Sequence, residues 1–165
     1  MITDSATLIM GILFTIAIFA PVVFFVYLGK KRLLKTSKII SRIQFKGNFK
    51  FTEKDVWNDH GLAIDPLKKA MVWVDTSTAN YKWRIIDLTK VWNSQVVDTP
   101  NMIQLIITYR DDQNHPFEVI TLFDAKIDDP FEKGFHGVLA KKWNARIHQL
   151  IHKSTSPTIT PRRAA

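Results

Sequence analysis

The sequence predicts an α+β protein in which a single N-terminal transmembrane helix precedes an antiparallel β-barrel or sandwich, closed by a C-terminal amphipathic helix. Three observations support this prediction. Residues 5–29 are apolar and carry no charge, residues 61–123 contain a succession of short β-rich runs, and residues 131–151 repeat apolar side chains at helical spacing. At 165 residues, the chain has room for one domain of ordinary size after the apolar stretch.

The apolar stretch 5–29 has the length and the flanking charges of a membrane anchor. At about 1.5 Å per residue, a helix of this length crosses a hydrocarbon core of roughly 30 Å. Lys30, Lys31 and Arg32 follow it directly, whereas the charged residue ahead of it is Asp4. The positive-inside rule therefore predicts a single-pass protein of the inner (plasma) membrane, with its N-terminus outside and the remainder cytoplasmic.

A cleaved signal peptide and a buried core helix are the alternatives for residues 1–29. A signal peptide carries its positive charge ahead of the apolar run and small residues at its cleavage site, but here the charge order is reversed and Ile18 is large. A core helix would show a polar face, and this stretch has none. Pro21 is tolerated in membrane helices, and Tyr27 suits the interfacial belt.

Residues 30–41 form a basic juxtamembrane segment. Near an anionic membrane surface each basic side chain contributes about 1 kcal/mol of attraction, so topology and lipid contact account for this charge without a nucleic-acid partner. The apolar spacing allows the anchor helix to continue, and a short basic linker is an equal alternative. The five basic residues expected at the membrane surface are Lys30, Lys31, Arg32, Lys35 and Lys38.

Residues 42–153 are expected to fold as a cytoplasmic domain. Thr52 to Asp55 has the form of a capping box, which predicts a helical turn through Trp57. In residues 81–85, Tyr81, Trp83 and Ile85 alternate with Lys82 and Arg84, and the aromatic face is expected to point to the core. Six strands are expected, at 61–65, 70–75, 81–85, 90–97, 102–110 and 117–123, with a further candidate at 42–51.

The final element is a predicted helix that begins at Asp128-Asp129-Pro130, an acidic cap followed by proline at the first helical position. Residues 154–165 are polar and contain proline, which predicts a flexible tail. The expected core stripe of the helix consists of Phe131, Phe135, Val138, Leu139, Trp143, Ile147, Leu150 and Ile151.

Residues 42–153 resemble the bacterial membrane-anchored pleckstrin-homology-like (PH-like) domains. The resemblance rests on the succession of short strands closed by one helix with Trp143 on its inner face, on the Ile85-Ile86-Asp87-Leu88 step and on the Phe123-Asp124 strand end. It implies a small barrel without enzymatic activity that binds peptides along a sheet edge or beside the helix. Lys68 and Lys69 lie near the hairpin that binds phosphoinositides in some PH domains, but the full basic pattern is not present.

The sequence predicts neither catalysis nor a cofactor or metal. It contains no cysteine, and it lacks the GxSxG, HExxH and Gly-rich phosphate-binding motifs. His148 and His152 are four residues apart and could share a metal, but the alternative is a solvent-facing pair near a helix C-terminus.

Two classes of function are compatible with these features. The first is a membrane-anchored adaptor or accessory subunit that binds a protein partner, with Trp57 and Trp92 as candidate anchors unless they are core residues. The second is a sensor of anionic lipid that uses the five juxtamembrane residues together with Lys68, Lys69, Lys82 and Arg84. A phage- or plasmid-encoded exclusion factor is a further alternative, and the sequence leaves the oligomeric state open.

Overall fold

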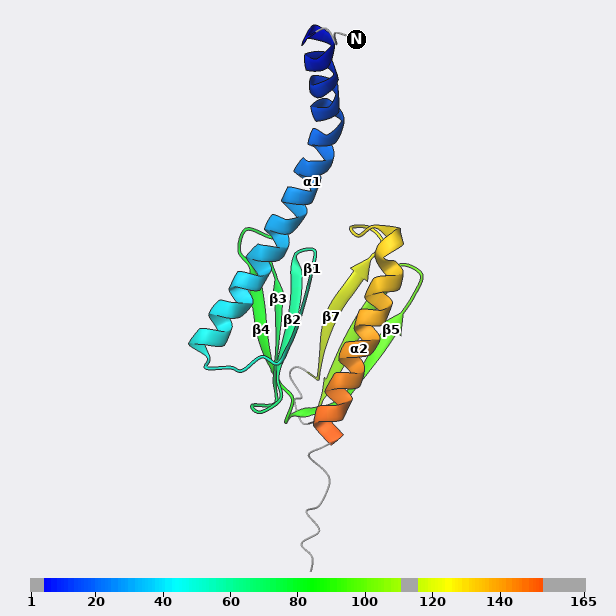
Figure 1. The fold of residues 1–165 in the computed structure, drawn as a ribbon. Helices are drawn as coiled ribbons and strands as arrows, with labels where there is room; N and C mark the ends of the chain where they lie inside the picture. The colour runs from blue at the N-terminus through cyan, green and yellow to red at the C-terminus, as the bar shows by residue number, and fades with distance from the viewer. Residues whose placement is uncertain (1–4, 111–115, 153–165) are drawn as a thin grey trace, which may run out of the picture.

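The computed structural model describes residues 5–110 and 116–152, and it shows one long helix, two antiparallel sheets and a C-terminal helix (Figure 1). The hydrophilic loop expected around 111–115 and the tail expected at 154–165 lie outside the described residues. The elements are α1 (Ser5–Lys46), β1 (Glu53–Trp57), β2 (His60–Asp65), β3 (Ala70–Asp75), β4 (Lys82–Asp87), β5 (Val91–Asp98), β6 (Met102–Tyr109), β7 (Phe117–Asp124), η1 (Pro130–Glu132) and α2 (Lys133–His152).

Helix α1 is continuous over 42 residues, and its two halves have different surroundings. Its apolar N-terminal half extends away from the rest of the molecule (Figure 1), and its C-terminal half packs on β1, β2 and β3. Thr36, Ile39 and Ile40 are already buried, so the packed domain begins before residue 42, where the boundary was expected. The juxtamembrane segment is therefore helical rather than a linker, and the candidate strand at 42–51 is wrong.

In sheet A, with strand order β1-β2-β3-β4, the central strands β2 and β3 are buried on both faces. Successive side chains of a strand point to opposite faces, so the two faces enter different cores. Ala63, Val72 and Val74 pack against Ile40 and its neighbours on α1. Leu62, Ile64, Met71 and Ile86 point the other way, toward sheet B and α2. This double burial explains why β2 and β3 are apolar at nearly every position.

Sheet B has strand order β5-β6-β7, and α2 packs against all three of its strands. The main core lies between the two sheets and α2, where Trp143 is 1% exposed. Among the described residues no strand pairing joins sheet A to sheet B, so the two sheets do not close into a barrel. The α+β class and all six expected strands are confirmed.

The helical turn expected after Thr52 is wrong, because this segment forms β1. Trp57 pairs with His60, and Asn58 and Asp59 form the two-residue loop between them. Asn58 has a positive φ of 44°, which is the left-handed conformation that such hairpin loops require. The amide of Thr52 donates to the carbonyl of Ile64. The residue expected to cap a helix therefore extends the hydrogen bonding between β1 and β2.

The aromatic face of β4 was expected in the core, and this expectation is wrong. Tyr81, Trp83 and Ile85 are 43–46% exposed, whereas Ile86 on the opposite face is 1% exposed. The alternation itself is as expected, but α1 packs on β1, β2 and β3 and leaves this face of the edge strand β4 uncovered.

The beginning of the stripe expected on α2 is also wrong. Phe131, Phe135 and Val138 are exposed, and His136 occupies the inner position that precedes Leu139 and Trp143. The start signal is confirmed, since the Asp129 side chain accepts a hydrogen bond from the Phe131 amide.

Candidate functional site

The candidate site is a groove of about 570 Å³ between the edge strands β4 of sheet A and β7 of sheet B. Among the described residues, β4 pairs with β3 alone and β7 with β6 alone. Each strand therefore presents a row of unpaired N–H and C=O groups along its outer edge. The groove is lined by Trp73, Asp75, Tyr81, Lys82, Trp83, Arg84, Phe117, Glu118 and Val119.

An ion pair joins the two sheets across this groove. The Nη1 atom of Arg84 lies 2.7 and 2.8 Å from the two carboxylate oxygens of Glu118. Both residues lie on the face that carries the buried Ile86 and Ile120 farther along their strands, so they point into the space between the sheets. Trp73 lies opposite Arg84 in the β3–β4 register and is packed against the main core.

Asp75 is the acidic group at one end of the groove. Its Oδ1 atom accepts a hydrogen bond of 2.9 Å from the Ser77 amide. Burial raises the pKa of this carboxyl, but hydrogen bonds from Ser77 and the nearby His60 and Lys82 lower it by more, so the pKa lies below its usual value. Asp75 is therefore negatively charged at neutral pH, opposite Lys82 in the sheet register.

Exposed apolar side chains flank the groove on both strands. Tyr81, directly before β4, and Trp83 of β4 are 43% and 46% exposed, and Phe117 and Val119 of β7 are 57% and 39% exposed. The site thus combines two bare strand edges, four apolar side chains and a neutralised pair of charges. This chemistry suits the binding of an extended polypeptide, with backbone hydrogen bonds for affinity and side-chain contacts for specificity.

The structure separates the four basic residues expected on one hairpin face. Lys82 and Arg84 line the groove. Lys68 lies at the β2–β3 turn, where its Nζ atom donates to the Gly47 carbonyl at 2.9 Å and lies 4.9 Å from the Phe49 ring centroid. Lys69 occupies the same turn with φ of 48°. This turn is beside the C-terminal end of α1, remote from its apolar half.

The two tryptophans expected as candidate anchors have different surroundings. Trp57 is 4% exposed and belongs to the main core, so it is a core residue. Trp92 is 62% exposed at a register shift in β5, with the Arg110 guanidinium 5.4 Å from its ring, and it lies outside the groove. Sequence reasoning missed Trp83 as a surface residue because it assigned the aromatic face of β4 to the core.

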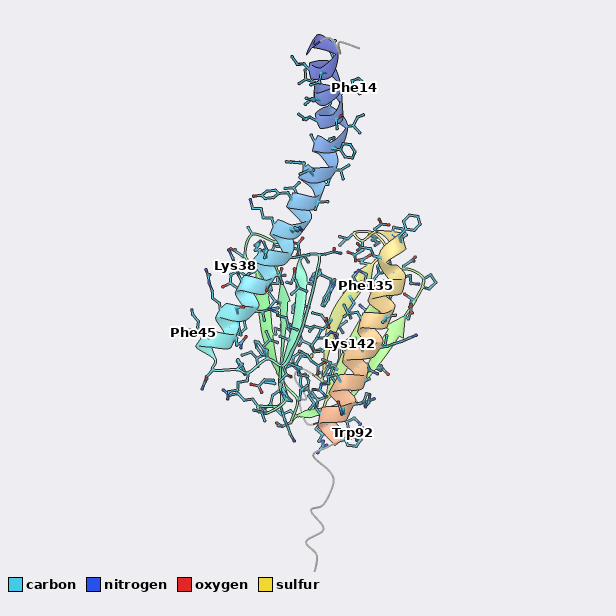
Figure 2. All side chains as sticks on the ribbon, viewed as in Figure 1. Phe14, Lys38, Phe45, Trp92, Phe135 and Lys142 are labelled. Atoms are coloured by element: carbon cyan, nitrogen blue, oxygen red, sulfur yellow. The ribbon has the colours of Figure 1, made fainter. Side chains whose placement is uncertain are left out.

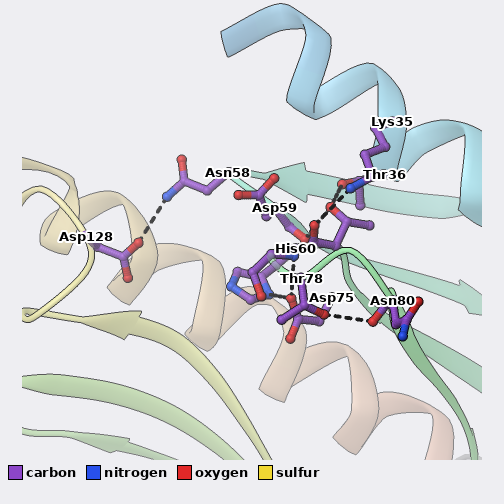
Figure 3. A network of polar contacts seen from close by, with 11 residues as sticks. Lys35, Thr36, Asn58, Asp59, His60, Asp75, Thr78, Asn80 and Asp128 are labelled. Atoms are coloured by element: carbon purple, nitrogen blue, oxygen red, sulfur yellow. Dashed lines mark hydrogen bonds and ion pairs between the residues drawn. The ribbon is translucent and has the colours of Figure 1, made fainter. Parts of the chain in front are cut away.

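A second groove, of about 620 Å³, lies where α1 meets the domain, and it contains three of the five juxtamembrane residues: Lys31, Lys35 and Lys38. The Lys35 Nζ atom donates to the Thr76 carbonyl at 3.1 Å, and the Thr36 and Thr76 hydroxyls lie 2.8 Å apart (Figure 3). The other two juxtamembrane residues, Lys30 and Arg32, also lie in α1, and Lys30 is exposed. The five residues expected at the membrane surface are thus helical, and three of them adjoin the β3–β4 loop.

The two histidines considered as metal ligands contact each other and sheet B. Their ring centroids are 5.7 Å apart, and the Nε2 atom of His148 lies 2.8 Å from the Ser94 carbonyl oxygen. Within residues 5–110 and 116–152, no cluster of three or more His, Cys, Asp or Glu residues is arranged to hold a metal ion.

No protein-family model, curated protein or solved structure matches this chain. Within the described part of the chain, one helix, over residues Leu8–Lys46, is long and apolar enough to cross a membrane. None of its most apolar stretch is buried against the domain. The interpretation of the site therefore depends on its own geometry.

Proposed function

We propose that this protein is a single-pass membrane adaptor that binds an extended segment of a protein partner in the groove between β4 and β7. The observation that carries this proposal is the uncovered corner of the sandwich. There, two unpaired strand edges and the exposed side chains of Tyr81, Trp83, Phe117 and Val119 lie around a single groove.

The anchoring part of the proposal rests on α1. Residues 8–29 would span about 33 Å as a helix, which matches the hydrocarbon thickness of a bilayer. The side chains described on this stretch are exposed, and lipid is the solvent that suits them. Lys30, Lys31 and Arg32 follow, so the positive-inside rule places the domain on the cytoplasmic side.

The continuity of α1 holds the domain close to the membrane. No loop intervenes between the apolar half and the packed half, and Thr36 is buried only six residues after Lys30. A domain attached in this way has a defined orientation, and its groove is presented at a fixed height below the bilayer. This arrangement is what an adaptor or accessory subunit of a membrane complex requires.

The occupant of the groove is a polypeptide in extended conformation. Addition of a strand to a bare sheet edge satisfies the backbone of both partners, and aromatic residues at the rim provide apolar contact area. The four-plus-three strand arrangement with one C-terminal helix supports a PH-like assignment. It is also consistent with peptide binding along a sheet edge, which the resemblance implies.

Lipid contact at the junction of α1 and the domain is a second candidate function. Lys31, Lys35 and Lys38 line the groove there and would lie at headgroup level. Lys68 does not join them, because it bonds Gly47, which is 17 residues or about 25 Å along the helix from Lys30. The proposed lipid-binding face thus contains fewer basic residues than the nine that the sequence analysis considered.

Affinity purification of the full-length protein in mild detergent tests the adaptor proposal. We expect a specific partner to co-purify with the wild-type protein and with Trp92→Ala, and to be reduced at least tenfold with Trp83→Ala, because Trp83 lies in the groove and Trp92 does not. Retention by Trp83→Ala together with loss by Trp92→Ala would move the binding site to β5 and contradict the proposal.

A further inference from the structure

Three large apolar side chains project from the segment that joins β7 to α2 and from the first turn of α2. Ile127 is 84% exposed, Phe131 is 96% exposed and Phe135 is 58% exposed. Figure 1 shows that this segment lies at the end of the domain toward which the apolar half of α1 extends, whereas the C-terminal end of α2 lies at the opposite end. Phe135, labelled in Figure 2, comes from the first turns of α2 at that same end.

We infer that the segment carrying Ile127 and Phe131 is a second membrane contact, immersed in the interface of the bilayer that α1 crosses. The inference rests on the proposed membrane anchoring, and it adds a site to that anchoring. Large apolar residues at the tip of a short segment enter the boundary between headgroups and acyl chains readily, and interfacial elements bury themselves about 5–10 Å deep.

A chain of hydrogen bonds fixes this segment relative to α1. The Thr36 hydroxyl contacts the Thr76 hydroxyl, which donates to the Asp59 carbonyl at 2.9 Å. In the same two-residue loop, the Asn58 amide donates to Asp128 at 3.2 Å, beside Ile127 (Figure 3). The other carboxylate oxygen of Asp128 accepts from the Asp124 amide at 2.8 Å and so closes the turn that presents Ile127.

The position of this network along α1 sets its height below the membrane. Thr36 follows Lys30 by six residues, which corresponds to about 9 Å along a helix. The polar headgroup layer occupies roughly 6 Å on each side of the hydrocarbon core. A segment attached at the level of Thr36 and pointing toward the apolar half of α1 therefore reaches this layer.

The acidic residues around the tip are held by bonds to the protein. Asp129 accepts the Phe131 amide, and Glu132 lies 3.4 Å from the Asn58 amide nitrogen and 3.5 Å from His136. Lys126, next to Ile127, is exposed and available to anionic headgroups. An apolar tip with one flanking cation is the pattern expected of an interfacial contact.

The absence of cysteine allows a direct test, since any introduced cysteine is a unique labelling site. The full-length protein is reconstituted into phosphatidylethanolamine–phosphatidylglycerol vesicles with an environment-sensitive fluorophore at Ile127→Cys, Phe19→Cys or Phe45→Cys. Quenching by lipids that carry a nitroxide near the headgroup is compared with quenching by aqueous iodide. Phe19 lies in the apolar half of α1, and Phe45 is 89% exposed at the opposite end of the helix.

The label at position 127 is expected to be quenched by the lipid nitroxide and shielded from iodide, and the label at position 45 is expected to show the reverse. Phe131→Ser, added to the Ile127→Cys protein, should reduce the lipid quenching severalfold. Iodide quenching at position 127 together with shielding from iodide at position 19 would overturn the inference and leave the anchor intact. Shielding from both quenchers would assign the tip to a protein contact, and iodide quenching at position 19 would overturn the anchor as well.

Discussion

The two corners at which sheets A and B approach each other are built differently. At one corner α2 packs against sheet B, and Lys142 and Arg146 on this helix form ion pairs with Asp55 and Glu53 of β1. At the other corner no helix of the described residues covers the edges of β4 and β7, and the Arg84–Glu118 ion pair links the two strands. The covered corner buries Trp143 and the open corner exposes Trp83.

This difference separates the scaffold from the site. The main core is complete with one corner covered, since Ile86 of β4 and Ile120 of β7 are each 1% exposed without a second helix. Aromatic residues at the open corner therefore contribute little to the core. The proposed protein partner would account for these exposed aromatic residues at a sheet edge, and substitutions at the two corners should then have opposite consequences for stability and binding.

The largest expected effect separates the two tryptophans. Trp143→Ala should lower the free energy of unfolding by about 3–5 kcal/mol, because it leaves a large cavity in the main core. Trp83→Ala should lower it by about 1 kcal/mol or less, because the side chain is half exposed. Urea denaturation of a chain that begins at Lys31, which keeps Thr36 and the buried isoleucines of α1, measures both. Equal losses would mean that the open corner is part of the scaffold.

The next effect concerns Asp65, a scaffold carboxylate at the β2–β3 turn that is 1% exposed. It accepts backbone hydrogen bonds from Lys50 at 2.6 Å, Leu67 at 2.9 Å and Lys68 at 3.0 Å. Asp65→Asn should cost about 2 kcal/mol at neutral pH, because an amide NH₂ cannot accept the hydrogen bond from Lys50.

The pH dependence of stability should show the same contribution from Asp65. Burial raises the pKa of Asp65, but the three amides and the Lys68 charge lower it by more, so the pKa lies below 3.8 in the folded protein. A carboxyl with a depressed pKa stabilises the fold above the unfolded value, and this stabilisation is lost as the pH falls through the folded pKa. Between pH 7 and pH 2, the free energy of unfolding should therefore fall less for Asp65→Asn than for the wild-type protein. An equal fall in stability for the variant and the wild-type protein would contradict the depressed pKa of Asp65.

The smallest expected effect compares the ion pairs of the two corners. Lys142–Asp55 and Arg84–Glu118 are both partly exposed, so each should contribute about 0.2–1 kcal/mol in a double-mutant cycle. The pairs should differ in binding, since only Arg84→Ala alters the groove. Partner capture that is weakened by Lys142→Ala and not by Arg84→Ala would place the partner on α2.

Sequence patterns predicted the elements better than the faces they bury. Alternation on β4 placed Tyr81, Trp83 and Ile85 together, but alternation does not say which face is covered, and on an edge strand the neighbouring Ile86 filled the core instead. On the C-terminal helix two apolar rows overlap. The hydrophobic pattern favours the row that begins at Phe131, but the buried row begins at His136, whose polarity removes it from that pattern.

Two other features depended on contacts that a local pattern does not contain. The capping box at Thr52 competed with a strand whose signal was the Asn58-Asp59 loop between Trp57 and His60. The groove joins β4 to β7, which are separated by two other strands, so no spacing in the sequence could bring Trp83 to Phe117. The juxtamembrane basic residues, in contrast, are local to one helix, so their cluster can be read from the sequence alone.

The most direct test of the adaptor proposal is site-specific photocrosslinking of the full-length protein in native membranes. A photoreactive phenylalanine analogue replaces Tyr81, directly before β4, or Val119 on β7, and the more exposed Trp92 and Phe45 serve as control positions. The proposal predicts that positions 81 and 119 crosslink to the same segment of one protein, and that neither control does. Crosslinks to that protein from position 92 or 45, with none from the two sides of the groove, would contradict it.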